Sequence, residues 1–382
     1  MLRHAVNGFA PRLTPLGQFA RLGGNALHIL QSKWMDTMNI YDISRLAGVS
    51  RKTVQRVLNG ATNVKPDTVA RIRSIMEHHH FEPNAAARKL SSSKPTTVGI
   101  FIVQDVRRYK LYTDDLFYGA VIGGIISCSN SKGYNVLVSI IDISNADELL
   151  SMYRKRSVDA GIIISWSNVQ AIADRVAEAG FPIAVFDQNN VQTPAANVLF
   201  PYLDNCRSAY DAACYLLDLG HKHLGFVTGD RSIPCSDQRL EGFLEAVRER
   251  GLTVASDDIM GGRFVERSGE EAIEIWLREN RLPEAIFCSN DLTAYGALQA
   301  LAKHRIAVPD RVSVLGFDDL LVSQYTHPPL TSMKVPRVEM AVSVTLSLIE
   351  RLEGATVPPS EPSSFRAAIT ERDSCRRASP SE

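Results

Sequence analysis

Long cationic and amide side chains recur near the amino terminus at a spacing that would place them on one face of a helix. Within residues 51–59 they fall at positions i, i+1, i+4 and i+5, and two short hydroxyls stand beside them. The set is Ser50, Arg51, Lys52, Thr53, Gln55 and Arg56. Guanidinium, ammonium and carboxamide groups reach phosphates and base edges, so the pattern favours DNA binding. A helix face that is merely solvated is the alternative.

The surrounding residues predict how these side chains are positioned. Residues 42–47 have helical apolar spacing, residues 48–50 suit a turn, and residues 51–59 suit a second helix whose first amides Ser50 can cap. The apolar seam between the two helices is expected to consist of Ile43, Leu46, Val49, Val54 and Leu58. The turn, the cap and the basic face together predict a helix-turn-helix.

A third helix is predicted from residue 66 to about residue 79. Pro66 suits the first helical position, and Asp67 suits the positive end of the helix dipole. The apolar positions recur every three or four residues and are Val69, Ile72, Ile75 and Met76. A third helix of this kind closes a small three-helix core.

At this point the chain from Met38 to about Arg377 resembles the lactose-repressor family of bacterial transcription regulators. The amino-terminal motif that carries the resemblance is Ala47-Gly48-Val49-Ser50, followed by Thr53-Val54 and by Arg56-Val57-Leu58-Asn59-Gly60. The resemblance adds Asn59 to the set of DNA-binding residues. Gln55 stands where many members carry serine, so an operator preference cannot be carried over.

The segment after the third helix resembles the hinge helix of that family. The matching residues are Pro83-Asn84, Ala87-Arg88 and Leu90. The resemblance implies that Asn84, Ala87 and Leu90 contact DNA, and that the hinge becomes ordered on the operator. There, paired Leu90 side chains would wedge into the minor groove and kink it, as a short apolar side chain can do.

Charge is distributed unevenly along a chain whose formal net charge is zero. Residues 38–95 hold ten Lys or Arg against four Asp or Glu, whereas residues 96–382 hold 28 against 37. The small amino-terminal module is therefore expected to approach polyanionic DNA, and the larger part would be repelled by it.

Beyond the polar linker at residues 91–95, the pattern changes to short apolar runs that alternate with amphipathic stretches. The runs are residues 98–103, 136–141, 161–165, 183–186, 224–227, 285–288 and 312–317. The helical stretches are residues 117–131, 169–179, 208–219, 239–250, 269–278 and 292–304. Runs of this kind are typical of parallel strands buried on both faces, so the pattern predicts a doubly wound α/β architecture.

The length and the family resemblance imply two such subdomains facing across a cleft, as in periplasmic binding proteins. The predicted fold class is therefore a small all-α helix-turn-helix headpiece followed by two doubly wound α/β subdomains. The expected domains are 38–83 for DNA binding, 84–95 for hinge and linker, 96–377 for effector binding and dimerisation, and a tail at 378–382. Residues 1–37 are expected to be a disordered leader or a mis-assigned start.

Ligands of open α/β sheets bind at the carboxyl ends of strands. Polar groups follow four of the predicted strands, at Asp105, at Asp187-Gln188, in residues 228–239 and in residues 289–291. Arg239 could donate a planar fork to ligand oxygens, and Asp291 could accept bonds from two hydroxyls. Alternatively, Asn290 or Asp291 only caps the following helix, and Arg239 is solvated.

The resemblance implies that Arg239 and Asp291 hold an effector, because residues 239–243, 288–291 and 296–298 match two pocket motifs of the family. By register it adds Phe117, Tyr118 and Phe264 to the effector-binding set, which also includes Asp187. Aromatic faces beside charged groups suit a sugar, although aromatic residues also serve as core. Basic residues within 105–115 would suit an acidic sugar if that loop overhangs the cleft, and would do nothing as a solvated loop.

No motif points to catalysis, a cofactor or a metal. The chain has neither a phosphate-binding loop of the GxxxxGK type nor a GxSxG elbow, and the consecutive His78, His79 and His80 would splay around a helix. The six cysteines show no CxxC spacing and are expected to be reduced cytosolic thiols. No run reaches the roughly 20 apolar residues of a membrane span.

The sequence therefore predicts a cytoplasmic transcription regulator, a repressor, that binds a pseudopalindromic operator as a homodimer. A small sugar or sugar-derived effector would control it by changing how the two subdomains are oriented. The alternatives are a periplasmic-type sugar-binding protein, which would not need the basic helix-turn-helix, and a regulator that responds to a nucleobase or nucleoside. Gln188 and residues 233–235 differ from the purine-binding members of the family.

Overall fold

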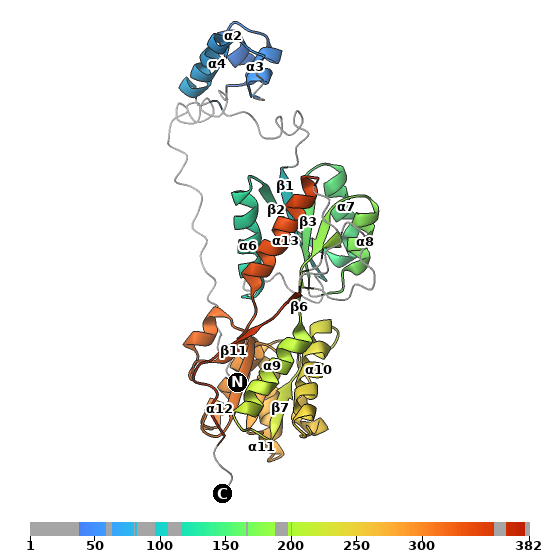
Figure 1. Ribbon diagram of the computed structural model, residues 1–382, viewed down its shortest axis with the longest axis vertical. Coiled ribbons are helices and arrows are strands. Elements are labelled where there is room, and N and C mark those ends of the chain that lie inside the picture. Colours follow the sequence, from blue (N-terminus) through green and yellow to red (C-terminus); the bar gives the residue numbers. More distant parts are fainter. Residues whose placement is uncertain are drawn as a thin grey trace, which may run out of the picture. The chain divides into compact units, whose positions relative to one another are not determined.

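In the computed structural model, the described residues of the amino-terminal unit form three short helices (Figure 1). The structure describes residues 38–58, 63–79, 81, 96–105, 116–165, 167–187, 198–199, 201–354 and 364–378. The chain divides into two units, Met1–Lys94 and Pro95–Glu382. The helices of the first unit are α2 (Ile40–Leu46), α3 (Arg51–Leu58) and α4 (Pro66–His78). Asn84, Ala87 and Leu90 of the predicted hinge, and Asn59, lie outside the described residues.

Local signals explain where these helices begin. The Asn39 side chain caps α2 and forms a capping box with Asp42. Ser50 caps α3 as predicted, because the Thr53 amide donates to Ser50 Oγ over 3.2 Å. Gly48 has a φ of +62°, the left-handed conformation that ends α2. Pro66 occupies the first turn of α4, also as predicted.

The core of the amino-terminal unit differs from the predicted seam at one position. The fully or nearly buried apolar residues are Ile43, Ala47, Val54, Val57 and Ile72. Leu46 was expected in the seam, but it is 51% exposed, so that prediction is wrong. In a helix of seven residues two faces satisfy apolar spacing almost equally well, and the small side chain of Ala47 allows α2 and α3 the closer approach.

The described part of the second unit holds two large sheets, one parallel and one mixed. The first sheet has the order β2-β1-β3-β4-β5, and all its described pairings are parallel. Its strands are β1 (Thr97–Gln104), β2 (Asn135–Asp142), β3 (Ala160–Ile164), β4 (Ile183–Val185) and β5 (Val198–Leu199). The prediction that such runs are buried on both faces is wrong for β2, because it is an edge strand whose Val138 and Ile140 are exposed.

Four helices cover the two faces of the first sheet. They are α6 (Tyr118–Ser131), α7 (Ala146–Arg154), α8 (Gln170–Glu178) and α13 (Arg337–Leu352). Val98 and Ile100 of β1 face the cluster that contains α6 and α13, whereas Phe101 and Val103 face α7 and α8, as strand alternation requires. The short helix η1 (Ile143–Asn145) follows β2. We call this assembly the first lobe.

The second sheet has the order β13-β11-β10-β9-β7-β8, and only the β11–β13 pairing is antiparallel. Its strands are β7 (Leu224–Val227), β8 (Ile259–Met260), β9 (Ala285–Cys288), β10 (Ser313–Asp318), β11 (Thr331–Lys334) and β13 (Ala368–Thr370). Its helices are α9 (Asn205–Asp218), α10 (Pro234–Glu249), α11 (Glu266–Arg278) and α12 (Asp291–Lys303). The short helices η2 (Ser256–Asp258) and η3 (Leu321–Tyr325) precede β8 and β11. We call this assembly the second lobe.

Close helix packing in the second lobe depends on glycine. A side chain added at Gly296 of α12 would lie 1.8 Å from the Glu266 carbonyl oxygen, and one added at Gly269 of α11 would lie 2.0 Å from the Thr293 carbonyl oxygen. Only residues without a Cβ allow α11 and α12 to approach this closely. The helix α12 also contacts β9 and β10, and it begins at Asp291, shortly after β9 ends at Cys288.

The chain passes between the two lobes more than once. The helix α13 follows β11 of the second lobe but packs against α6 of the first, and β13 then returns to the second sheet. Two further strands, β6 (Tyr202–Leu203) and β12 (Ser364–Phe365), form a separate parallel pair. The strand β6 lies between β5 of the first lobe and α9 of the second, and β12 lies between α13 and β13. The predicted α/β fold class is confirmed, although the sequence pattern did not reveal this return of the chain to the first lobe.

Candidate functional site

The exposed face of α3 carries the cationic side chains that the sequence singled out. Arg51, Lys52 and Arg56 are exposed, whereas Val54 and Val57 on the opposite face are buried in the core. The Ser50 hydroxyl lies 3.0 Å from the Thr53 hydroxyl, so both short side chains take part in the cap. Gln55 and Thr53 are half-buried. The helix therefore presents its three cations as one surface.

Asp42 on α2, an acid of the same unit, is already engaged. Asp42 on α2 accepts from Arg45 over 3.1 Å and from the Asn39 amide over 3.1 Å. In the described part of the chain, none of the three cations of α3 forms an ion pair with a carboxylate. Instead, the Arg51 guanidinium lies over the Tyr41 ring of α2, 4.5 Å from its centre. Unpaired cations on an exposed helix are available to a polyanion.

The second lobe contains a buried arginine at the carboxyl ends of its strands. Arg239 of α10 is 4% exposed; its Nε donates to Asn205 Oδ1 over 2.9 Å, and its Nη1 donates to the Ser289 carbonyl over 2.5 Å. The guanidinium also lies 3.8 Å from the centre of the Phe317 ring. These contacts exclude the alternative that Arg239 is a solvated surface residue.

Asp318, which the sequence pattern did not single out, stands beside this arginine. Its Oδ1 is 3.9 Å from Arg239 Nη1, and both side chains are buried. Burial raises the pKa of Asp318 well above its usual value, and the positive charge of Arg239 opposes the shift. Asp318 ends strand β10, so the rule that ligands bind at strand ends, applied to residues 312–317, would have identified it.

Asp187 brings the first lobe to the same place. It follows β4 with a φ of +56°, and its Oδ1 accepts from the Leu203 amide over 3.1 Å. Burial raises the pKa of Asp187 to about 6, while the Leu203 amide and the charge of Arg239 lower it. Because Arg239 acts on both carboxyl groups, Asp187 and Asp318 belong to one electrostatic cluster around it.

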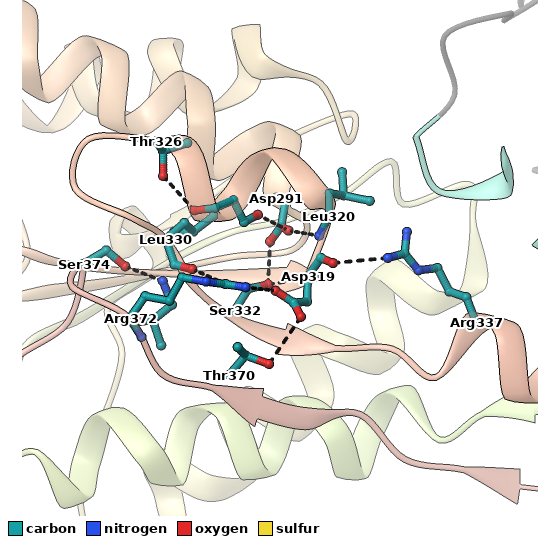
Figure 2. A network of polar contacts seen from close by, with 12 residues as sticks. Asp291, Asp319, Leu320, Thr326, Leu330, Ser332, Arg337, Thr370, Arg372 and Ser374 are labelled. Atoms are coloured by element: carbon teal, nitrogen blue, oxygen red, sulfur yellow. Dashed lines mark hydrogen bonds and ion pairs between the residues drawn. The ribbon is translucent and has the colours of Figure 1, made fainter. Parts of the chain in front are cut away.

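Both carboxylate oxygens of Asp291 already accept hydrogen bonds from other residues of the protein. Its Oδ2 accepts from the Leu320 amide over 2.7 Å and from Ser323 Oγ over 2.6 Å, and its Oδ1 accepts from Ser332 Oγ over 2.5 Å (Figure 2). The side chain is fully buried. Asp291 thus ties the start of α12 to residues 320–332, and contact with an effector stays a prediction. Asn290 caps α12, as the alternative interpretation held, by accepting from the Thr293 amide.

The three predicted aromatic residues are buried. Phe117 and Tyr118 stand at the start of α6 with ring centres 5.1 Å apart. Phe264 has a φ of +62°, and its ring lies against Gly229, where an added Cβ would come within 1.9 Å of it. Its ring centre is 5.9 Å from the Arg239 guanidinium carbon, so Phe264 is brought to the cluster, whereas Phe117 contacts a different arginine.

That arginine, Arg337, is a second residue that the sequence did not reveal. Its guanidinium carbon lies 5.4 Å from the centre of the Phe117 ring, and its Nη1 donates to the Leu116 carbonyl over 3.3 Å. Its Nη2 donates to the Asp319 carbonyl over 3.1 Å (Figure 2). Arg337 therefore links the first lobe to the turn that carries Asp318. The sequence could not give this link, because it depends on the packing of α13 against the first lobe.

Two hydroxyl groups near Arg239 are buried without a hydrogen-bond partner in the described part of the chain. They belong to Ser236, one turn earlier on α10, and to Ser289, whose carbonyl Arg239 contacts. Buried polar atoms are nearly always satisfied by protein, water or ligand, so unpaired ones mark places where another molecule can contribute. Gln188 and residues 106–115, which bore on the effector class, lie outside the described residues.

Within the part of the chain that the structure describes, no helix is long and apolar enough to cross a membrane. The same residues contain no group of three or more His, Cys, Asp or Glu side chains that could hold a metal ion. His78 and His79 place their rings edge to face, 4.9 Å apart, at the end of α4.

Comparison with known proteins gives two family matches. Residues 39–84 match the bacterial regulatory proteins of the lacI family, and residues 213–375 match the periplasmic binding protein-like domain. Catabolite control protein A of Priestia megaterium is 31% identical over 85% of this chain and 95% of its own length. The transcriptional regulator AscG of Escherichia coli is 29% identical over 87% of this chain and 97% of its own length.

Solved structures give the same comparison in three dimensions. The lac repressor dimer bound to operator and the anti-inducer ONPF has a TM-score of 0.75 and 23% identity, covering 89% of this chain and 99% of that one. This likeness shows a shared fold. The Escherichia coli transcriptional repressor ascG has a TM-score of 0.64 and 27% identity, covering 74% of this chain and 99% of that one.

Proposed function

Because the chain belongs to the lacI family of bacterial regulatory proteins, we propose that it is a transcriptional repressor whose hold on operator DNA is controlled by a small sugar or sugar-derived effector. The observation that carries DNA binding is the face of α3, where Arg51, Lys52 and Arg56 are exposed and without carboxylate partners among the described residues. The related proteins are transcriptional regulators and not enzymes. A repressor that binds operator DNA would act in the cytoplasm.

We propose that the repressor acts as a homodimer. In the second lobe, Leu321 is 72% exposed and Tyr325 is 67% exposed, and both belong to the short helix η3. In the first lobe, Val138 and Ile140 leave the edge strand β2 apolar and exposed. Clustered exposed apolar side chains mark surfaces that a partner covers, and a second copy related by two-fold symmetry is the commonest partner. Two copies would read the two halves of a pseudopalindrome.

The proposed effector site is the cluster of Asp187, Arg239, Phe264 and Asp318. Carboxyl groups and a guanidinium group supply acceptors and donors for sugar hydroxyls, and an aromatic ring supplies a face for the CH groups of the sugar. The hydroxyls of Ser236 and Ser289, which have no partner among the described residues, support this assignment because a polyol can satisfy them. Asp187 comes from the first lobe and Arg239 from the second, so a ligand that contacts both would favour one orientation of the lobes.

A gel-shift experiment tests the DNA-binding part of the proposal. The intact protein is titrated against the DNA upstream of its own coding region, and the titration is repeated with Arg56→Ala. A specific shift that the substitution weakens is expected, because Arg56 contributes a donor from the exposed face of α3. If the intact protein shifts this DNA no better than an unrelated duplex of equal length, regulation of its own gene is excluded. If a genome-wide binding experiment also finds no specific site, the proposed repressor function is excluded.

A thermal-shift screen tests the effector part. Neutral sugars, sugar acids and nucleobases are each added to the intact protein and to Arg239→Lys. A sugar that stabilises the intact protein but not the variant supports the site, since a ligand stabilises the state it binds. A nucleobase as the only hit contradicts the sugar assignment and favours a nucleobase-responsive repressor.

A further inference from the structure

We propose that Arg51 reads a guanine in each operator half-site and that Tyr41 is the positioning residue that holds its guanidinium for this contact. The inference rests on the proposed operator binding and adds the base that is read and a residue outside the predicted DNA-binding set. Arg51 is the first residue of α3. In helix-turn-helix proteins the amino-terminal residues of the second helix are those that reach base edges in the major groove.

Tyr41 occupies an unusual position for a large aromatic residue. It is 59% exposed on α2, yet the face of its ring is covered by the Arg51 guanidinium at 4.5 Å. A guanidinium is attracted to an aromatic face by the ring quadrupole and by stacking. The contact therefore restrains the long, flexible side chain of Arg51 at the surface of the amino-terminal unit before any DNA is present.

No neighbouring acid competes for this guanidinium among the described residues. Asp42 is next to Tyr41 in the sequence, but its carboxylate accepts from Arg45 and from the Asn39 amide, each over 3.1 Å. Lys52 and Arg56, the other charged residues on this face of α3, are cations and repel the guanidinium. The ring of Tyr41 is thus the group that determines where Arg51 rests.

Stacking and base recognition use different parts of the guanidinium. The ring contacts the flat face, whereas the N–H donors point outward from the edge, so Arg51 can keep the stack and still donate two parallel bonds. Guanine offers two acceptors, O6 and N7, side by side in the major groove, and paired donation from arginine is the commonest specific contact there. A phosphate would accept the same donors but would carry no sequence information.

The test is selection of double-stranded DNA by the full-length protein from a library with randomised half-sites, followed by titration of duplexes that differ at single base pairs. The wild type is expected to select guanine at one position of each half-site. Arg51→Ala should reduce the preference at that position by about 5- to 150-fold, the range for one paired arginine contact. The other positions should keep their preferences.

Tyr41 variants separate positioning from folding. Tyr41→Leu should reduce the preference for guanine at the same position by about two- to fivefold, the range for an exposed cation–aromatic contact. Tyr41→Phe keeps the ring and should retain the preference. In the Arg51→Ala background, Tyr41→Leu should change the preference no further, which a general loss of fold would not produce. Arg73→Ala, an exposed arginine on α4, is the matched control and should leave all base preferences intact.

Each outcome is decisive. Selection of half-sites without an Arg51-dependent guanine overturns the base assignment, because Arg51 then contacts only phosphate or nothing. An unchanged preference in Tyr41→Leu overturns the positioning role, and an equal loss in Tyr41→Phe does the same. If the wild type selects no sequence at all, the proposed operator binding itself fails, which distinguishes that failure from the failure of this inference.

Discussion

Replacing the buried Asp291 by asparagine should remove a pH dependence from the stability of the second lobe. Three donors converge on its carboxylate, from the Leu320 amide and from the hydroxyls of Ser323 and Ser332 (Figure 2). Burial nevertheless raises the pKa of Asp291 from 3.8 to about 6, and these hydrogen bonds only partly oppose the shift. The neutral acid is therefore favoured in the folded state.

The sign and size of the effect follow from the two pKa values. A carboxyl group whose pKa is higher in the folded state contributes stability that is present below about pH 4 and is lost as the pH rises to about 6 and beyond. A shift of about two units corresponds to about 3 kcal/mol in the free energy of unfolding. The wild type should lose about 3 kcal/mol of stability as the pH rises from about 4 to about 7. The carboxamide of Asp291→Asn does not titrate, so the difference in unfolding free energy between this variant and the wild type should change by about 3 kcal/mol in favour of the variant over the same range.

Asp291→Ala is the contrasting variant. It removes the acceptor altogether and leaves the buried Leu320 amide without a partner, while Ser323 keeps its contact with the Tyr295 hydroxyl at 2.8 Å. An unsatisfied buried donor costs about 1 to 3 kcal/mol, and the vacated space adds to that cost. Asparagine can still accept from the Leu320 amide through its oxygen, so at about pH 7 alanine should be clearly less stable than asparagine.

The assay is urea unfolding followed by tryptophan fluorescence at several pH values. Trp276 is fully buried in the second lobe and its Nε1 donates to the Asp257 carbonyl, so it reports on this lobe. Phenylalanine at positions 34 and 166 in every protein compared makes Trp276 the single reporter. Taking differences between variant and wild type cancels the titration of Asp187. The charge of Asp291 raises the pKa of Asp318, so the variant also lowers the pKa of Asp318, and the measured difference includes that change. Parallel stability curves for Asp291→Asn and the wild type across this pH range would refute the reasoning.

Three further outcomes are expected. Gly296→Ala should destabilise the second lobe by about 2 kcal/mol or more in urea unfolding, since the added Cβ would lie 1.8 Å from a backbone oxygen. Gly123→Ala in α6 is the control: its added Cβ would meet no atom within 4 Å, so this variant should be neutral or stabilise by up to about 1 kcal/mol. Ser50→Ala should cost about 1 kcal/mol in thermal unfolding of the amino-terminal unit, because the Thr53 amide loses its side-chain acceptor, and no loss would contradict the cap. Leu321→Asp should convert the homodimer to a monomer in sedimentation experiments, and an unchanged dimer would exclude η3 as the interface.

Local signals made the amino-terminal unit predictable. The cap at Ser50, the turn at Gly48 and Pro66 at the start of α4 act within a few residues, so their effect can be derived from the sequence alone. The exposure of Leu46 could not be derived in this way. It depends on how closely α2 and α3 pack, which the alternation of apolar residues in so short a helix does not determine.

The proposed effector site was only partly predictable because its members come from distant segments. Arg239 and Asp187 follow from the positions of strand ends, and Asp318 would have followed from the same rule. The role of Asp291 could not be inferred, since its partners Leu320, Ser323 and Ser332 lie 29 to 41 residues away along the chain. Arg337 required knowledge that α13 returns to the first lobe.

That return has a consequence for the synthesis of the protein. The first lobe lacks one of its covering helices until α13 (Arg337–Leu352) has been made, and the second sheet lacks an edge strand until β13 (Ala368–Thr370) has been made. The segment after β13 is also required, because the Val314 amide donates to the Ser374 carbonyl over 2.8 Å. On the ribosome, neither lobe can therefore complete its native contacts before nearly the whole chain has been translated. A stop codon near residue 335 would remove α13 from the first lobe and β13 from the second.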